Sequence, residues 1–230
     1  MPIMCTRLPR VESSYVCPAL LALVVLLGSS FAAGASSAAT VGAQIGVNQC
    51  GLYGDNPANS SYVTRTGVVA GALGQFDIAH GISLGLEPAY VRKANGWKTA
   101  EDAAGDQEQF DLTLDYITLP VVVKFFSAGG HAYCSSGLMF DFLSKATLSD
   151  RNGDTDVKSA LKSTDVGLLL GVGGVFPIGR PSLTTELRFV HGLVNPVKDN
   201  ATSALNNLPV RVYSYGFELI AGIQFPLGNR

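Results

Sequence analysis

Apolar side chains recur at every second position in eight segments of this chain. The clearest segment is 213–227, where the odd positions carry Tyr, Phe, Leu, Ala and Ile and most even positions carry small or polar residues. A period of two is typical of a β-strand whose two faces meet different surroundings. The same alternation runs through residues 41–53, 66–76, 82–90, 117–126, 132–145, 166–176 and 182–189. We therefore expect an all-β protein of eight antiparallel strands.

The connections between these segments alternate in length. Short links lie at residues 77–81, 127–130 and 177–181, and long polar ones at 54–62, 94–109, 147–163 and 194–210. This alternation is typical of an up-and-down transmembrane β-barrel with short periplasmic turns and four long extracellular loops. The alternative is a secreted soluble sandwich or lipocalin-like barrel, whose apolar faces would point inward.

Charged residues within the strands lie on the less apolar face, four of each sign. They are Arg65, Glu87, Lys124, Asp141, Lys145, Glu186, Arg188 and Glu218. An eight-stranded barrel has an interior just wide enough for side chains. Because a buried ion needs a partner, we expect these eight residues to form a charge network in the lumen.

The first forty residues have a different pattern from the rest. Arg7 and Arg10 precede the nine-residue apolar run 19–27, and small residues follow it. This is the plan of a secretory signal peptide, and the run is too short to span a bilayer as a helix. We expect residues 1–35 to be cleaved and residues 36–230 to form the barrel in the bacterial outer membrane, although cleavage after Ala38 or Ala39 fits nearly as well.

Composition agrees with a membrane barrel. Hydrophobic residues make up 47% of the chain and charged residues 15%, against about 25% charged in soluble domains. Without residues 1–35 the chain has 14 basic and 17 acidic residues, which gives nucleic-acid binding no support. An oxidising envelope would permit a disulfide between Cys50 and Cys134.

One string of residues resembles a known family. The run Leu114-Asp115-Tyr116, followed by Pro120 and Lys124, is similar to the LDY-x-x-(I/L)-P-x-x-x-K pattern in the fourth strand of PorT-like outer-membrane β-barrel proteins. The resemblance implies export and membrane insertion. Apolar positions change phase between Tyr116 and Ile117, which predicts a bulge near that point.

The end of the chain resembles the signal that the barrel-assembly machinery reads. Gly222, Phe225 and Leu227 follow the required spacing. The implied partners are that machinery, periplasmic chaperones and the lipid bilayer, with a further unknown partner at the loops. Pro226 lacks the amide that a strand ladder uses.

Candidate chemistry is sparse. His191 with Ser135 or Ser136 allows a lipid-A-modifying His/Ser hydrolase to be imagined, but no spacing requires one. Residues 150–156 carry several oxygen ligands without the order of an EF-hand, so we expect a solvated loop and no metal or cofactor. Trp97 and five tyrosines near the long loops predict an aromatic girdle; these tyrosines are Tyr53, Tyr62, Tyr90, Tyr213 and Tyr215.

The sequence therefore predicts a non-enzymatic envelope barrel that is structural or presents its loops to partners. A narrow channel or porin for ions or small solutes is the alternative, and a lipid-A-modifying enzyme comes after it.

Overall fold

The computed structural model describes residues 39–54, 60–99, 108–198 and 211–228. All of them belong to one compact unit that begins at Ala38. The predicted signal peptide lies outside the described residues.

Strands make up nearly all of the described structure. They are β1 (Ala39–Gly54), β2 (Ser60–Ala79), β3 (Ile82–Leu86), β4 (Ala89–Thr99), β5 (Gln109–Phe126), β6 (Ala132–Asp150), β7 (Gly153–Asp156), β8 (Thr164–Pro177), β9 (Ser182–Gly192) and β10 (Val212–Leu227). A single 3-10 turn, η3 (Lys158–Ala160), interrupts this order among the described residues. Within that part of the chain, no helix is long and apolar enough to cross a membrane.

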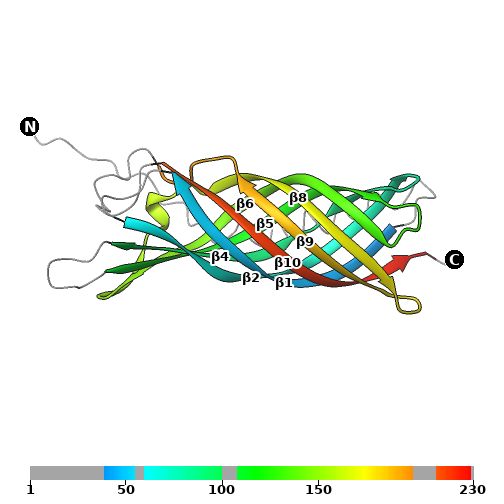
Figure 1. The fold of residues 1–230 in the computed structure, drawn as a ribbon, viewed down its shortest axis with the longest axis horizontal. Helices are drawn as coiled ribbons and strands as arrows, with labels where there is room; N and C mark the ends of the chain where they lie inside the picture. Colours follow the sequence, from blue (N-terminus) through cyan, green and yellow to red (C-terminus); the bar gives the residue numbers. More distant parts are fainter. Residues whose placement is uncertain (1–38, 55–59, 100–107, 199–210, 229–230) are drawn as a thin grey trace, which may run out of the picture. The chain divides into compact units, whose positions relative to one another are not determined.

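The strands form a closed antiparallel ring. Each strand of the ring pairs on both sides; β6 pairs directly with β8, because β7 pairs with β6 alone, and β1 pairs with β10 from Ala39↔Leu227 to Gly54↔Val212. Figure 1 shows the strands running obliquely beside one another, with blue β1 next to red β10. Because this last pairing joins the first strand to the final one, the sheet closes into a barrel.

The ring has eight strand positions. β3 and β4 occupy one of them, since both pair with β2 on one side and β5 on the other. The two are separated only by Glu87 and Pro88, and proline has no amide to donate to the ladder. The neighbouring register is kept across the break, where the Glu87 amide donates to the Pro120 carbonyl at 3.1 Å. The predicted count of eight is confirmed.

Burial alternates along the strands as the sequence predicts. In β10, Phe217, Leu219 and Phe225 are exposed, whereas Glu218 and Ile220 between them are buried. The larger apolar side chains therefore lie mainly outside the barrel, and most buried polar side chains lie inside it. A soluble barrel would show the opposite arrangement.

Several strands extend further than predicted at the end of the barrel that carries the long connections. β4 runs to Thr99 and β5 starts at Gln109, so much of the predicted loop 94–109 is a β-hairpin. Likewise, predicted loop 147–163 contains the end of β6, β7 and η3. Polar residues in these segments indicated loops, but ladder pairing extends the barrel wall through them.

Candidate functional site in the barrel interior

Four charged side chains from three strand positions meet inside the barrel. Lys124 of β5 lies 2.8 Å from Glu87 and 3.6 Å from Glu186, and Arg188 of β9 contacts both carboxylates. All four residues are at most 5% exposed. We call these four residues the ionic network. Each carboxylate meets two cations, which is the arrangement that makes burial of ions tolerable.

Neutral side chains from β6 complete the environment of Glu186. The Tyr133 hydroxyl donates to Oε2 at 2.8 Å and the Ser135 hydroxyl to Oε1 at 2.7 Å. The Lys124 ammonium also lies 5.1 Å from the centre of the Tyr133 ring, within the range of a cation–π interaction. Glu186 is therefore held from β5, β6 and β9 at once.

Glycines on β8 make room for these side chains. A Cβ at Gly171 would lie 2.4 Å from Ser135 Oγ, and one at Gly173 would lie 2.4 Å from Tyr133 Cζ. Both contacts are too close for any side chain. Glycine at these two positions therefore admits the bulkier side chains of Ser135 and Tyr133.

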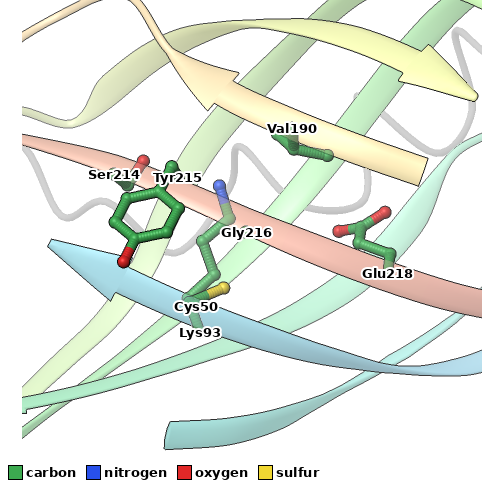
Figure 2. A pocket seen from close by; sticks show the side chains of 7 residues that line it. All are labelled: Cys50, Lys93, Val190, Ser214, Tyr215, Gly216 and Glu218. Carbon is green, nitrogen blue, oxygen red and sulfur yellow. The ribbon is translucent and has the colours of Figure 1, made fainter. Parts of the chain in front are cut away.

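A second ion pair lies elsewhere in the interior. Lys93 of β4 lies 2.6 Å from Asp141 of β6 and 5.0 Å from the centre of the Tyr116 ring. Next to it is a cavity of about 10 Å³, room for about one water molecule, lined by Cys50, Lys93, Val190, Ser214, Tyr215, Gly216 and Glu218. Figure 2 shows these side chains arriving from β1, β4, β9 and β10.

An apolar cluster fills the barrel at the long-connection end. We call it the mouth cluster; its buried members are Trp97, Phe110, Leu112, Leu114, Tyr116, Leu143, Ala146, Leu148, Val157, Ala160, Leu161, Val197 and Val212. Val157, Ala160 and Leu161 come from the connection that contains η3, and a bridge joins Leu161 to Val197 of the β9–β10 connection. Two connections thus fold onto the inner wall of the barrel and cover it.

Comparison with known proteins agrees with this architecture. Residues 31–197 match the family model described as outer membrane protein beta-barrel domain. The chain belongs to this outer-membrane β-barrel family. The barrel therefore lies in the bacterial outer membrane, with its apolar outer face against lipid.

Several solved structures have a similar fold at low sequence identity. The barrel is 14% identical to Neisserial surface protein A, with a TM-score of 0.43, covering 80% of this chain and 96% of that one. It is 14% identical to Ail of Yersinia pestis (TM-score 0.41, 81% and 98% covered) and 8% identical to OprG of Pseudomonas aeruginosa (0.43, 84% and 97%). No curated protein matches the sequence.

Six of the eight charged residues predicted for the lumen are buried inside this outer-membrane barrel: Glu87, Lys124, Asp141, Glu186, Arg188 and Glu218. The first two join Glu186 and Arg188 in the ionic network, whereas Asp141 pairs with Lys93. Glu218 borders the cavity and faces Arg188 in the β10–β9 register.

The prediction was wrong for the remaining two residues, Lys145 and Arg65, which do not belong to the interior network. Lys145 is exposed on the outer face, because β6 carries an extra residue, Ser144, opposite β5: Asp115 pairs with Lys145, and Tyr116 pairs with Leu143. This bulge reverses the phase of the strand after Leu143. The sequence placed the bulge in β5 near Tyr116, whereas the structure places it across the ladder in β6. Arg65 lies away from the network and pairs with Asp111 at 2.9 Å.

Sequence reasoning missed Lys93. The residue shares the phase of Glu87, Ala89 and Val91, so extending the third segment beyond Tyr90 would have found it. The predicted equal number of positive and negative charges in the lumen is also wrong. The buried charged residues of the described chain are three cations, Lys93, Lys124 and Arg188, and six carboxylates, Glu87, Asp115, Asp141, Asp165, Glu186 and Glu218, of which Asp115 lies on the outward phase of β5.

The predicted aromatic girdle is partly wrong. Trp97 is 1% exposed and stacks on Phe110 inside the barrel, because it continues the inward phase of Lys93 and Asn95. An aromatic group does lie on the outer face at the long-connection end. There Tyr53 stacks with His191 and Tyr213 and shares a 3.1 Å hydrogen bond with His191.

The candidate chemical groups are not brought together. Ser135 points inward to Glu186, whereas His191 lies on the outer face against Tyr53. Ser136 shares the outer phase but lies two strand positions from His191, since β8 separates β6 from β9. Cys50 is buried and Cys134 is exposed, and both are free thiols, so no disulfide joins them. At the β6–β7 turn, Asp150 accepts the Asn152 amide and Asp154 accepts the Ser149 hydroxyl. Across the described ranges, no cluster of His, Cys, Asp and Glu side chains has the geometry of a metal site.

The residues of the predicted assembly signal lie on β10, the strand that closes the barrel against β1. Phe225 pairs with Val41 and Leu227 with Ala39. Both are exposed on the outer face, whereas Gly222 is half-buried.

Proposed function

We propose that this outer-membrane β-barrel is a non-conducting, non-enzymatic envelope protein that presents its long connections at the cell surface. The observation that carries the proposal is the filled interior, where the mouth cluster, the Lys93–Asp141 pair and the ionic network occupy the lumen. A continuous water path would have to displace buried, mutually paired ions, and each unpaired ion would cost several kcal/mol, roughly.

The orientation and biogenesis belong to the same proposal. The long connections face the outside and the short turns face the periplasm, as in bacterial barrels of this topology. Residues 1–35 are removed on export, periplasmic chaperones escort the chain, and Gly222, Phe225 and Leu227 guide assembly. The LDY motif at Leu114 to Tyr116 supports a finer assignment to PorT-like barrels.

The absence of an enzymatic role is supported by the same geometry. A hydrolase needs its nucleophile and base within hydrogen-bond reach. Ser135 and His191 lie on opposite faces of the barrel wall, and Ser135 donates to a buried carboxylate.

A channel is the competing function, and conductance separates the two. Folded protein in planar bilayers should give no conductance steps at either polarity. A channel would give steps whose ion selectivity changes in Glu186→Gln or Arg188→Gln and stays unchanged in the control Arg180→Gln, which alters an exposed turn residue. Reproducible steps of that kind would refute the proposal.

A further inference from the structure

The lipid-facing surface carries one charged group at the edge of its apolar band. On β5 the outward positions from Ile117 to Phe125 are all apolar, and on β6 those from Ala132 to Phe142 carry no charge. The next outward positions towards the long connections are Asp115 and Lys145, and on β4 Arg92 follows Tyr90. Charge therefore begins on three adjacent strand positions where the apolar run ends.

The three charged residues form a line across the sheet. Arg92 pairs with Asp115, and Asp115 pairs with Lys145, in the ladders β4–β5 and β5–β6. The Arg92 Nε lies 2.8 Å from Asp115 Oδ1, and the Tyr90 hydroxyl donates to the same oxygen at 2.8 Å. Asp115 thus fixes the position of the Arg92 guanidinium. The Lys145 ammonium is close enough to interact electrostatically with the Asp115 carboxylate.

Both cations remain open to the outside. The Arg92 side chain is 49% exposed whereas that of Asp115 is 11% exposed, and Lys145 is exposed. Within the described residues, Arg92 Nη1 has no partner. A third cation is adjacent, because Lys158 Nζ donates to the Ser144 carbonyl at 2.7 Å; Asp156, which accepts the Lys158 amide, adds a second carboxylate to the group. The patch keeps an excess of one positive charge.

We propose that Arg92 and Lys145 bind a phosphate of lipid A, the phosphorylated glycolipid of the outer leaflet. An arginine or lysine facing lipid costs about 2–4 kcal/mol at the bilayer midplane and about 0–1 near the interface, so this patch belongs at headgroup level. Arginine suits a phosphate because its planar fork donates two hydrogen bonds, and lysine adds a point charge. The proposal rests on the orientation proposed above, which puts the patch in the outer leaflet.

The bulge at Ser144 creates this site. If Ser144 were paired in a regular ladder, with no bulge, Lys145 would keep the inward phase of Asp141 and Leu143, and Arg92 would be the one cation of this pair that faces the lipid. The bulge in β6 thus places Lys145 on the outer face, next to Asp115 and on the opposite side of it from Arg92.

The test uses protein purified from outer membranes and measures lipid binding by native mass spectrometry in detergent. Bisphosphorylated lipid A should bind the unaltered protein, and Arg92→Gln/Lys145→Gln should bind it about tenfold more weakly. The matched control Arg180→Gln/Arg211→Gln removes two other exposed cations and should bind as the unaltered protein does. Dephosphorylated lipid A should bind all three proteins equally weakly.

Further arms separate the competing outcomes. Equal lipid A binding by the double variant and the control would overturn the proposal, as would displacement of lipid A by millimolar inorganic phosphate, because a free-phosphate site would then explain the affinity. Heat modifiability on a gel verifies that each variant is folded. Protease access to the loops on whole cells tests the orientation, and conductance tests the lumen, so failure of either is distinguishable from failure of this site.

Discussion

Arg188 shows how a single residue can stabilise the interior of a membrane barrel. It contacts both carboxylates of the ionic network and is 2% exposed. The energetic importance of such a residue lies in what its removal leaves behind, namely two buried carboxylates with Lys124 as their remaining cation. Breaking a buried ion pair from one side destabilises strongly, whereas removing all partners together costs less.

Arg188→Met should therefore lower the free energy of unfolding by about 3 to 5 kcal/mol. Glu186→Gln in the same chain should recover part of this loss, because Lys124 then pairs with Glu87 alone and no buried carboxylate lacks a cation. Urea unfolding in detergent micelles, followed by the gel shift, measures both. Arg180→Met in the exposed β8–β9 turn is the control and should stay within about 0.5 kcal/mol. Equal stability of Arg188→Met and this control would mean that the network is unimportant for folding.

At the scale of elements, the β6–β8 connection is held to the barrel by a few apolar side chains. Val157 and Leu161 are 1% and 2% exposed within the mouth cluster. Hydrogen bonds from Lys162 N to Pro196 O at 2.7 Å and from Lys198 N to Ala160 O at 3.0 Å tie it to the β9–β10 connection. The two connections should open as one local unit, independently of the barrel wall.

Leu161→Ala should loosen this unit without unfolding the barrel. Truncating a buried leucine costs about 2–5 kcal/mol. Here the truncation should lower the free energy of local opening of the two connections and leave that of global unfolding unchanged. Trypsin should cleave after Lys158 or Lys162 faster than in the unaltered protein, while the temperature of the gel shift stays unchanged. Leu193→Ala is the matched control, because Leu193 is 50% exposed. Unchanged cleavage in Leu161→Ala would show that the connection is held by other contacts.

The dimensions of the whole molecule agree with a bilayer. On β10 the outward apolar run extends from Phe217 to Leu227. The ten steps between these two residues, at about 3.3 Å each and tilted by about 40°, rise about 25 Å along the barrel axis, which is the height of the apolar band of outer-membrane barrels. The strands that continue beyond this band, such as β4 and β5, therefore project past the membrane surface.

The mature chain should accordingly fold only where its outer face meets lipid or detergent. Refolded in detergent, it should migrate faster unboiled than boiled and show β-rich circular dichroism, and in plain buffer it should show neither. The physical reason is that outward side chains such as Phe217 and Leu219 are 53% and 57% exposed, so the protein leaves a large apolar surface uncovered. A soluble, folded sample in plain buffer without a gel shift would contradict the membrane assignment.

The number of strands, the apolar and polar faces of each strand and the location in a membrane can be read from the sequence alone. These follow from local alternation, because successive side chains in a strand point to opposite faces. Alternation also predicted the inward position of Glu87, Lys124 and Arg188, since the register between strands does not shift next to any of them. The same rule would have reached Lys93 had the segment been followed three residues further.

The side-chain positions that depend on the register between strands are known only from the tertiary structure. Lys145 is outside because of a bulge that is defined by pairing with β5, and a single strand pattern does not contain that information. Trp97 is inside because the β4–β5 hairpin continues the barrel wall around the mouth cluster. The choice of partners within the network likewise depends on which strands the closed ring brings together, since Glu87 and Arg188 are far apart in the chain.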